Sequence, residues 1–373
     1  MKNLLIAGYA LKYFYLPIIP QKGKYMQRFF KLVSFLFFSI SAAALLCACK
    51  PKIENKPVPP QQKHELTIGF SIDSFVIERW RRDCDVFMAT AKENGASVIV
   101  QDAGNDVNEQ IKQIQYLIDS KVDVLVIVPK SADSLAEVVQ NAVDAGIPVI
   151  SYDRLMVNTP VDLYITINSR KSGELMAQGL LEHKNYGKWC CILGAPEDYN
   201  MHMMSEGIHN VLSKSSVSIY SEFFTEEWNY DLSYRKMNEL LESGFVPDGV
   251  LCGNDAVAET VLRSLSEHRI GNVLVSGQDA DIAACQRVIA GVQTLTVYKP
   301  ITQLAQKAAE CAVELAKGKK PADLPAINEE IDNGFGQIPV LWLDPQLVTA
   351  QNIDDVIIKT GFHTEEEIYR YAR

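Results

Sequence analysis

Polar side chains follow three successive apolar runs in the second half of the chain. Asn254 and Asp255 come directly after the first run. Gln278 and Asp279 come after the second run, and Lys299 ends the third. Because helix-length segments separate the runs, we expect a parallel sheet that binds its ligand at the carboxyl ends of the strands. Such side chains, with no metal-binding pattern among them, indicate a polar, uncharged ligand that is rich in hydroxyl groups.

A structural explanation exists for each of these residues, because Asn and Asp are also the usual N-terminal caps of helices. Any one of them alone would be explained as a cap. Several together, on neighbouring strands, favour a ligand site.

The sequence lacks the common signatures of catalysis and of cofactor binding. It has no Gly-x-Ser-x-Gly, P-loop, His-Glu-x-x-His or Cys-x-x-Cys motif, and 334–336 lacks the third glycine of a dinucleotide site. The run 201–204, Met-His-Met-Met, is better explained as packing at the start of a helix than as a soft metal site. We therefore expect a protein that is not an enzyme and holds neither cofactor nor metal.

The segments that position these residues follow a regular alternation. Short apolar runs and helix-length stretches alternate from residue 66 onward, and about 310 residues exceed one ordinary core, so two lobes are expected. The predicted strands are 66–70, 97–100, 122–128, 148–151, 164–167, 189–193, 217–224, 250–252, 273–275, 294–298 and 338–343.

The start of the chain carries an export signal. It has a basic segment from Met26, an apolar stretch over 32–46, and Ala48 before Cys49, which resembles a bacterial lipobox. We expect Cys49 to be lipidated and to become the mature N-terminus. The alternative is a membrane anchor, but the stretch is short for a span and ends in a cysteine. Residues 1–25 fit no part of a signal, so Met26 is the expected start.

The charge balance argues against some partners. Six basic and no acidic residues precede Cys49, so the formal net charge changes from −10 to −16 when they are removed. Such a chain is not expected to bind nucleic acid or an anionic membrane surface. The Pro-, Lys- and Gln-rich segment 50–64 predicts a tether, too short for a helix-turn-helix domain. The six later cysteines are expected to be buried thiols, with Cys190 and Cys191 on opposite faces of a strand.

Several motifs together point to a family. Gly-Gln-Asp-Ala-Asp at 277–281 and Thr-Val-Tyr-Lys-Pro-Ile-Thr at 296–302 resemble the periplasmic sugar-binding proteins of the ribose and galactose type. Further matches are Glu-Arg-Trp, Asp-Val-Leu-Val-Ile-Val-Pro, Ser-Tyr-Asp-Arg, Gly-Asn-Asp and Ile-Ile-Lys-Thr-Gly-Phe-His. The resemblance spans roughly Leu66 to His363 and is strongest to the branch that binds D-xylose for ABC importers.

The resemblance implies an α/β fold with two doubly wound parallel-sheet lobes, joined by a hinge of three crossings (periplasmic binding protein type I). The crossings are expected near Asn168, at Lys299, and within 338–343. The implied organisation is a signal region (1–48), a lipidated Cys and tether (49–64), lobe 1 (65–167 plus 300–339) and lobe 2 (168–299 plus 340–373).

The resemblance also implies the ligand contacts. They are Arg79, Trp80, Asp153, Arg154, Asp198, Asn200, Trp228, Asn254, Asp279 and Lys299. By spacing alone, Trp80 belongs to the apolar face of its helix and would be core. Asp153 and Arg154 could form a surface pair, and Trp228, in a polar setting, favours stacking on a ligand.

The implied function is a lipid-anchored protein of the periplasm or cell surface, expected as a monomer. It would trap an aldopentose, D-xylose, between its lobes and deliver it to an ABC permease. The alternative is a sugar sensor whose closed form docks on a chemoreceptor or sensor kinase. Departures from the family at Glu197, Tyr199 and 168–169 leave the sugar preference open.

Overall fold

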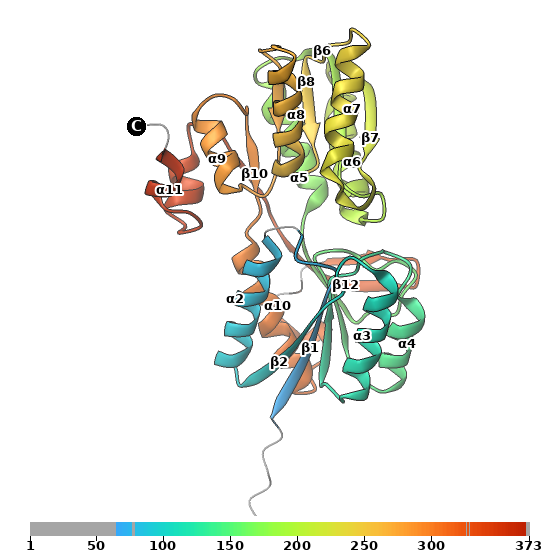
Figure 1. Cartoon of the computed structure of the whole chain (residues 1–373). Helices are drawn as coiled ribbons and strands as arrows, with labels where there is room; N and C mark the ends of the chain where they lie inside the picture. Colours follow the sequence, from blue (N-terminus) through green and yellow to red (C-terminus); the bar gives the residue numbers. More distant parts are fainter. Residues whose placement is uncertain (1–64, 77–78, 326, 328, 371–373) are drawn as a thin grey trace, which may run out of the picture. The chain divides into compact units, whose positions relative to one another are not determined.

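The computed structural model describes residues 65–76, 79–325, 327 and 329–370. The expected signal region, the lipidated Cys49 and the tether lie outside the described residues. Within the part that the structure describes, no helix is long and apolar enough to cross a membrane. These residues form two α/β lobes, each built on its own sheet (Figure 1).

The first lobe is built on a seven-stranded sheet. Its strands, in spatial order, are β11 (Glu329–Asp332), β12 (Gln337–Leu343), β5 (Leu163–Ile167), β4 (Val149–Tyr152), β3 (Val124–Ile127), β1 (Leu66–Ile72) and β2 (Ala96–Asp102). All neighbours are parallel except the edge pair β11 and β12. β11 is not among the strands that the sequence predicts. Three of its four residues are exposed and only Ile331 is half-buried, so no apolar run marks this strand in the sequence.

Helices cover both faces of this sheet. They are α2 (Arg79–Glu93) and α10 (Ile301–Ala316) on one face, and α3 (Val107–Asp119) and α4 (Ala136–Asp144) on the other. Each face has its own hydrophobic cluster. Strands buried on both faces are the reason that β3 and β4 appear as continuous apolar runs.

The second lobe is built on a smaller parallel sheet. Its strands, in spatial order, are β7 (Ser216–Phe224), β6 (Tyr186–Leu193), β8 (Gly249–Cys252) and β9 (Leu274–Ser276). The neighbouring β10 (Thr296–Tyr298) pairs antiparallel with β13 (Gln346–Val348). A bridge from Ser276 to Leu295 connects this pair to β9.

Helices also cover both faces of the second sheet. They are α5 (Ser169–Leu181) and α6 (Tyr199–Leu212) on one face, and α7 (Tyr230–Glu242) and α8 (Asp255–Glu267) on the other. The helix α9 (Ile282–Ile289) packs beside β10 and α11 instead. Short 3-10 turns stand at Glu226–Trp228 and, in the first lobe, at Pro321–Asp323. Cys191 packs in the cluster under α5 and α6, and Cys190 in the cluster under α7 and α8. The six described cysteines are buried free thiols, as predicted.

The chain passes between the lobes three times. It leaves the first sheet between β5 and α5, returns between β10 and α10, and leaves again between β12 and β13. This confirms the predicted fold class. β12 pairs with β5 as far as Leu343, so the whole strand belongs to the first sheet. The lobe boundaries given above stay a prediction.

The C-terminal segment packs across this region. It contains a π-helical turn at Asp354–Ile358 and α11 (Glu365–Tyr369). Its buried side chains Ile353, Ile357, Phe362 and Ile368 join the cluster that contains α2 and α10. The segment therefore stands close to the helix that carries Arg79 and Trp80.

Candidate functional site

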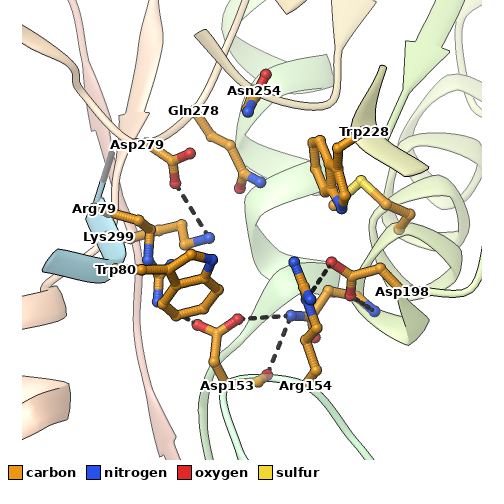
Figure 2. Close-up of a pocket in the computed structure, with 12 residues that line it drawn as sticks. Arg79, Trp80, Asp153, Arg154, Asp198, Trp228, Asn254, Gln278, Asp279 and Lys299 are labelled. Atoms are coloured by element: carbon orange, nitrogen blue, oxygen red, sulfur yellow. Dashed lines mark hydrogen bonds and ion pairs between the residues drawn. The ribbon is translucent and has the colours of Figure 1, made fainter. Parts of the chain in front are cut away.

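All ten residues predicted as ligand contacts line one pocket (Figure 2). The space between its atoms amounts to about 310 Å³. Met201 and Gln278 complete the wall.

The carboxyl ends of the strands bring these residues together, as the sequence predicts. Arg79 and Trp80 stand in the first turn of α2, and Asp153 and Arg154 directly follow β4. The second lobe contributes the residues that follow β6, β7, β8 and β9, and Lys299 directly follows β10. The alternative of a surface pair at Asp153 and Arg154 is wrong, because both residues are buried.

Two carboxylates hold the guanidinium of Arg79. Its Nη2 lies 2.5 Å from Asp153 Oδ2 and 3.0 Å from Asp83 Oδ2. The hydroxyl of Tyr152 donates to the same Asp83 oxygen over 2.9 Å. Asp83 does not line the pocket, so it fixes Arg79 from behind and leaves Asp153 facing the interior.

Arg154 is held by one carboxylate from each lobe. Its Nη1 donates to Asp73 Oδ2 over 2.5 Å, and its Nε lies 2.8 Å from Asp198 Oδ2. Asp198 also caps α6, since its Oδ1 accepts from the backbone N–H of Asn200 over 3.0 Å. The start of α6 is thus tied to the end of β4.

Asp153 is fixed by both lobes. The Nδ2 of Asn200 donates to its backbone carbonyl and to its Oδ1, each over 3.1 Å. The hydroxyls of Tyr164 and Thr166 donate to the same carbonyl over 3.0 and 2.6 Å. These bonds hold a residue whose φ of +63° is uncommon outside glycine.

Asp279 and Lys299 form an ion pair beside the return crossing, with Oδ1 and Nζ 3.2 Å apart. The backbone at Asp279 and Ala280 is left-handed, with φ of +99° and +54°. The N–H of Asp279 donates to Val297 O over 2.8 Å, which ties this turn to β10. The turn directs the carboxylate into the pocket.

The two tryptophans differ in burial. Trp80 is 2% exposed and belongs to the core cluster, as spacing alone predicts, and it also lines the pocket, while its contact with a ligand stays a prediction. The guanidinium of Arg79 lies 4.2 Å from its ring centroid. Trp228 is half-buried, and a Cβ on Gly194 would fall 2.2 Å from its ring. Only glycine at 194 therefore lets this ring lie where it does.

Burial raises the pKa of carboxyl groups in and around the pocket, whereas neighbouring cationic side chains lower it. Burial would raise the pKa of Asp153, but Arg79, Lys299 and Arg154 outweigh it and hold the pKa below its usual value. Burial raises the pKa of Asp198, which Arg154 only partly offsets. Burial also raises the pKa of Asp83, to about 6, although Arg79 opposes it.

The pocket wall thus combines three cationic side chains with three carboxylic acids. Such a wall suits an uncharged ligand whose hydroxyl groups form charge-assisted hydrogen bonds. Among the described residues, no group of three or more His, Cys, Asp or Glu side chains could hold a metal ion.

Asn254 is a helix cap and also lines the pocket, while its contact with a ligand stays a prediction. Its Oδ1 caps α8 by accepting from the N–H of Val257 over 2.9 Å. Its Nδ2 donates to the hydroxyl of Tyr230 over 3.3 Å, and the residue lines the pocket. A cap and a pocket residue are therefore the same side chain here.

Two pocket residues are absent from the ligand contacts that the resemblance implies. Gln278 follows the same strand as Asp279, and its position after an apolar run already placed it among the candidate residues of the ligand site. Met201 stands in the first turn of α6 and carried no such signal, because its spacing is that of a core residue.

Comparisons with known proteins agree with this architecture. Residues 68–320 match the family model described as the periplasmic binding protein domain. The D-xylose-binding periplasmic protein of Haemophilus influenzae is 40% identical over 311 residues, which cover 82% of this chain and 92% of that protein. Its namesake in Escherichia coli is 38% identical over 310 residues, covering 82% and 93%.

A solved structure also superposes on this one. It is an ABC transporter solute-binding protein from Clostridium phytofermentans with bound β-D-glucose, with a TM-score of 0.74 and 27% identity over 81% of this chain and 99% of that one. By its family model and these relatives, the chain belongs to the periplasmic binding proteins, a family of binding components rather than enzymes.

Proposed function

We propose that this protein binds an aldopentose, D-xylose, in the pocket and delivers it to the permease of an ABC importer. The observation that carries the proposal is the gathering of all ten predicted contacts around one pocket. The 40% and 38% identities to D-xylose-binding periplasmic proteins support the choice of sugar.

The chemistry of the wall supports a sugar. Indole rings, as at Trp80 and Trp228, suit the apolar C–H faces of a pyranose. Charged groups such as Asp153, Arg154 and Asp279 suit its hydroxyls, because hydrogen bonds to ionised groups are the stronger ones. Glu197, Tyr199, Asn168 and Ser169, where the chain departs from its relatives, are not among the residues that line the pocket. We therefore expect these departures to leave the preference for D-xylose intact.

The binding motion would be a hinge closure. Three crossings connect the lobes, and periplasmic binding proteins are a known example of such closure. Bound sugar would be enclosed by residues of both lobes, and the closed form would be the one that a permease recognises. The protein would act in the periplasm or at the cell surface, as a monomer.

Calorimetric titration of the purified protein tests the proposal. The panel contains D-xylose, L-arabinose, D-ribose and D-glucose, and we expect D-xylose to bind most tightly. Tighter binding of D-glucose would contradict the pentose assignment, and no binding of any sugar would contradict the function itself. As a control, each sugar is incubated with the protein for a long time and then analysed for reaction products, and we expect none.

We also propose that Cys49 is the lipidated N-terminus of the mature protein. The support is the small residue Ala48 before it and the apolar stretch that precedes both. Two or more acyl chains would be needed, because one chain binds a membrane only marginally. Mass spectrometry of the native protein should find a diacylglyceryl group on Cys49, and Cys49→Ala should remain unprocessed or soluble. An unmodified Cys49 would contradict this.

A sensory role is the second candidate. One relative, 27% identical over 81% of this chain, is the multiple sugar-binding periplasmic receptor ChvE of Rhizobium radiobacter. Crosslinking in cells grown with D-xylose separates the two roles. Recovery of a permease subunit supports import, whereas recovery of a chemoreceptor or sensor kinase supports sensing.

A further inference from the structure

Gln278 presents a buried hydrogen-bond acceptor to the pocket. The residue is 3% exposed, and its Nε2 donates to the backbone carbonyl of Gly253 over 2.8 Å. Because a carbonyl can only accept, the amide nitrogen must face Gly253, which leaves Oε1 as the free end of the side chain. Figure 2 shows this carboxamide pointing into the pocket. Among the described residues, Oε1 has no hydrogen-bond partner.

The position of this acceptor is fixed from several directions. The carbonyl of Gln278 accepts from the N–H of Asp255 over 3.0 Å, at the first turn of α8. Gly253, its side-chain partner, donates its own N–H to Ile192 O over 2.8 Å. The acceptor therefore stands on two neighbouring strand ends and would need no reorganisation to receive a donor from a ligand.

Unpaired donors accompany this acceptor. The indole Nε1 atoms of Trp80 and Trp228 are likewise buried, without a hydrogen-bond partner among the described residues. A ligand that satisfies all three must both donate and accept hydrogen bonds. A hydroxyl group is a neutral group that does both.

We propose that Gln278 Oε1 accepts a hydrogen bond from one hydroxyl of the bound monosaccharide and so determines which sugars the pocket accepts. The inference rests on the proposed sugar-binding function. A buried acceptor left unpaired by a sugar that lacks this hydroxyl lowers affinity by about 10- to 100-fold. The charged residues of the wall would bind the other hydroxyls.

A double-mutant cycle between protein and sugar tests the proposal. Wild type and Gln278→Met are titrated with D-xylose, its 2-, 3- and 4-deoxy analogues, and 1,5-anhydroxylitol, which lacks the anomeric hydroxyl. Met keeps the length of Gln without its amide. We expect wild type to bind one analogue about 10- to 100-fold more weakly than D-xylose. For Gln278→Met, the dissociation constants of that analogue and of D-xylose should differ by no more than about threefold. For each of the remaining analogues, the loss of affinity relative to D-xylose should be the same in wild type and in Gln278→Met.

A matched control is Gln293→Met. Gln293 is also buried in the second lobe, where its Nε2 donates to Asp255 Oδ1 over 2.8 Å, but it does not line the pocket. This variant should be less stable than wild type, but it should discriminate between D-xylose and the analogue as strongly as wild type does. If Gln278→Met does not fold, the side-chain carbonyl carbon of Gln278 is followed by NMR in wild type. Its resonance should shift when D-xylose binds, and should not shift when the analogue that lacks the hydroxyl bound by Gln278 is added.

The outcomes separate the two proposals. Equal losses for every analogue in both proteins, or a carbonyl resonance that moves alike with all sugars, would overturn the role of Gln278 alone. A wild-type protein that binds none of the sugars would overturn the proposed function and this role with it.

Discussion

Arg154 and Asp198 join the two lobes through a buried ion pair, with Nε 2.8 Å from Oδ2 and side chains 4% and 5% exposed. Arg154 follows β4 of the first lobe, and Asp198 caps α6 of the second. Because Arg154 also binds Asp73 of the first lobe, its charge is shared by carboxylates on both sides. Removal of either charge should therefore affect the fold and the pocket together.

Asp198→Asn should lower both stability and sugar affinity. The amide oxygen of Asn can still cap α6, so the variant removes mainly the charge that faces Arg154. A buried charged group that loses part of its pairing costs about 1–3 kcal/mol, and we expect the free energy of unfolding to fall by that amount. Urea denaturation of the ligand-free protein measures it.

The matched control is Glu206→Gln. Glu206 binds Arg170 over 2.7 Å, but their side chains are 54% and 44% exposed. An exposed pair contributes about 0–1 kcal/mol, so this variant should resemble wild type. Equal effects of Asp198→Asn and Glu206→Gln would contradict a special role for the buried pair.

Asp255 should make stability depend on pH. Its Oδ1 accepts from Gln293 over 2.8 Å, and its Oδ2 accepts from Thr296 over 2.9 Å and from the N–H of Asp281 over 3.0 Å. Burial raises the pKa of this carboxyl to about 7. The folded protein then binds the proton more tightly than the unfolded chain, whose Asp pKa is about 3.9. Stability from this group is present below about pH 4 and is lost as the pH rises to about 7.

Asp255→Asn, which carries no titrating proton, should remove this dependence. Relative to the variant, wild type should lose on the order of a few kcal/mol between pH 4 and pH 7. Urea midpoints at four pH values measure the difference. Glu137→Gln, an exposed position on α4, should leave the wild-type profile unchanged. Parallel profiles for wild type and Asp255→Asn would contradict the prediction.

Asp279→Asn should weaken sugar binding by about two decades in dissociation constant, because a hydrogen bond to a charged group is lost. Asn is the informative substitution, since it tolerates the φ of +99° at this position, whereas Ala would add backbone strain. Calorimetry should find the loss, and the free energy of unfolding should also fall by about 1–3 kcal/mol, because Lys299 loses its partner in a buried ion pair. Asp119→Asn, an exposed carboxylate on α3, should bind as wild type does. Unchanged affinity in Asp279→Asn would refute the assignment.

The two tryptophans should separate stability from affinity. Trp80→Ala leaves a cavity in the core and should lower the free energy of unfolding by about 3–5 kcal/mol. It should also lower the affinity for the sugar. Trp228→Ala removes a half-buried ring and should lose affinity with a smaller change in melting temperature. Losing both should reduce affinity more than losing either one. Trp342→Ala, half-buried outside the pocket, is the control. Normal binding by Trp228→Ala would rule out a clamp between the two rings.

His363 should position the turn that carries Asp279. Its Nε2 lies 2.8 Å from the carbonyl oxygen of Ala280, and because a carbonyl only accepts, this nitrogen carries the proton. His363→Gln keeps a donor and should keep the affinity within a few-fold. His363→Leu should weaken binding by about tenfold. Rescue by Gln and not by Leu distinguishes positioning from packing. Equal affinity in both variants would contradict the prediction.

The sequence by itself determined the elements and the edge where the site lies. Apolar runs buried on both faces of a sheet, such as β3, β4 and β8, predict parallel strands because they lack alternation. The carboxyl ends of parallel strands meet at one edge, so the polar residues after each run could be assigned to one site. The resemblance to a family supplied Trp80, which spacing alone placed in the core. Whether these residues bind the sugar stays a prediction.

Only the tertiary structure decided which side chains pair. The contacts of Asp153 with Arg79 and Asn200 join residues 74 and 47 positions apart, and no local pattern encodes them. The left-handed turn at Asp279 and its tie to His363 likewise depend on a segment 83 residues further along the chain from Ala280. Local propensities fix helices and strands because neighbouring residues decide them. The roles of buried charges are fixed only when folding brings distant charges together and removes water from around them.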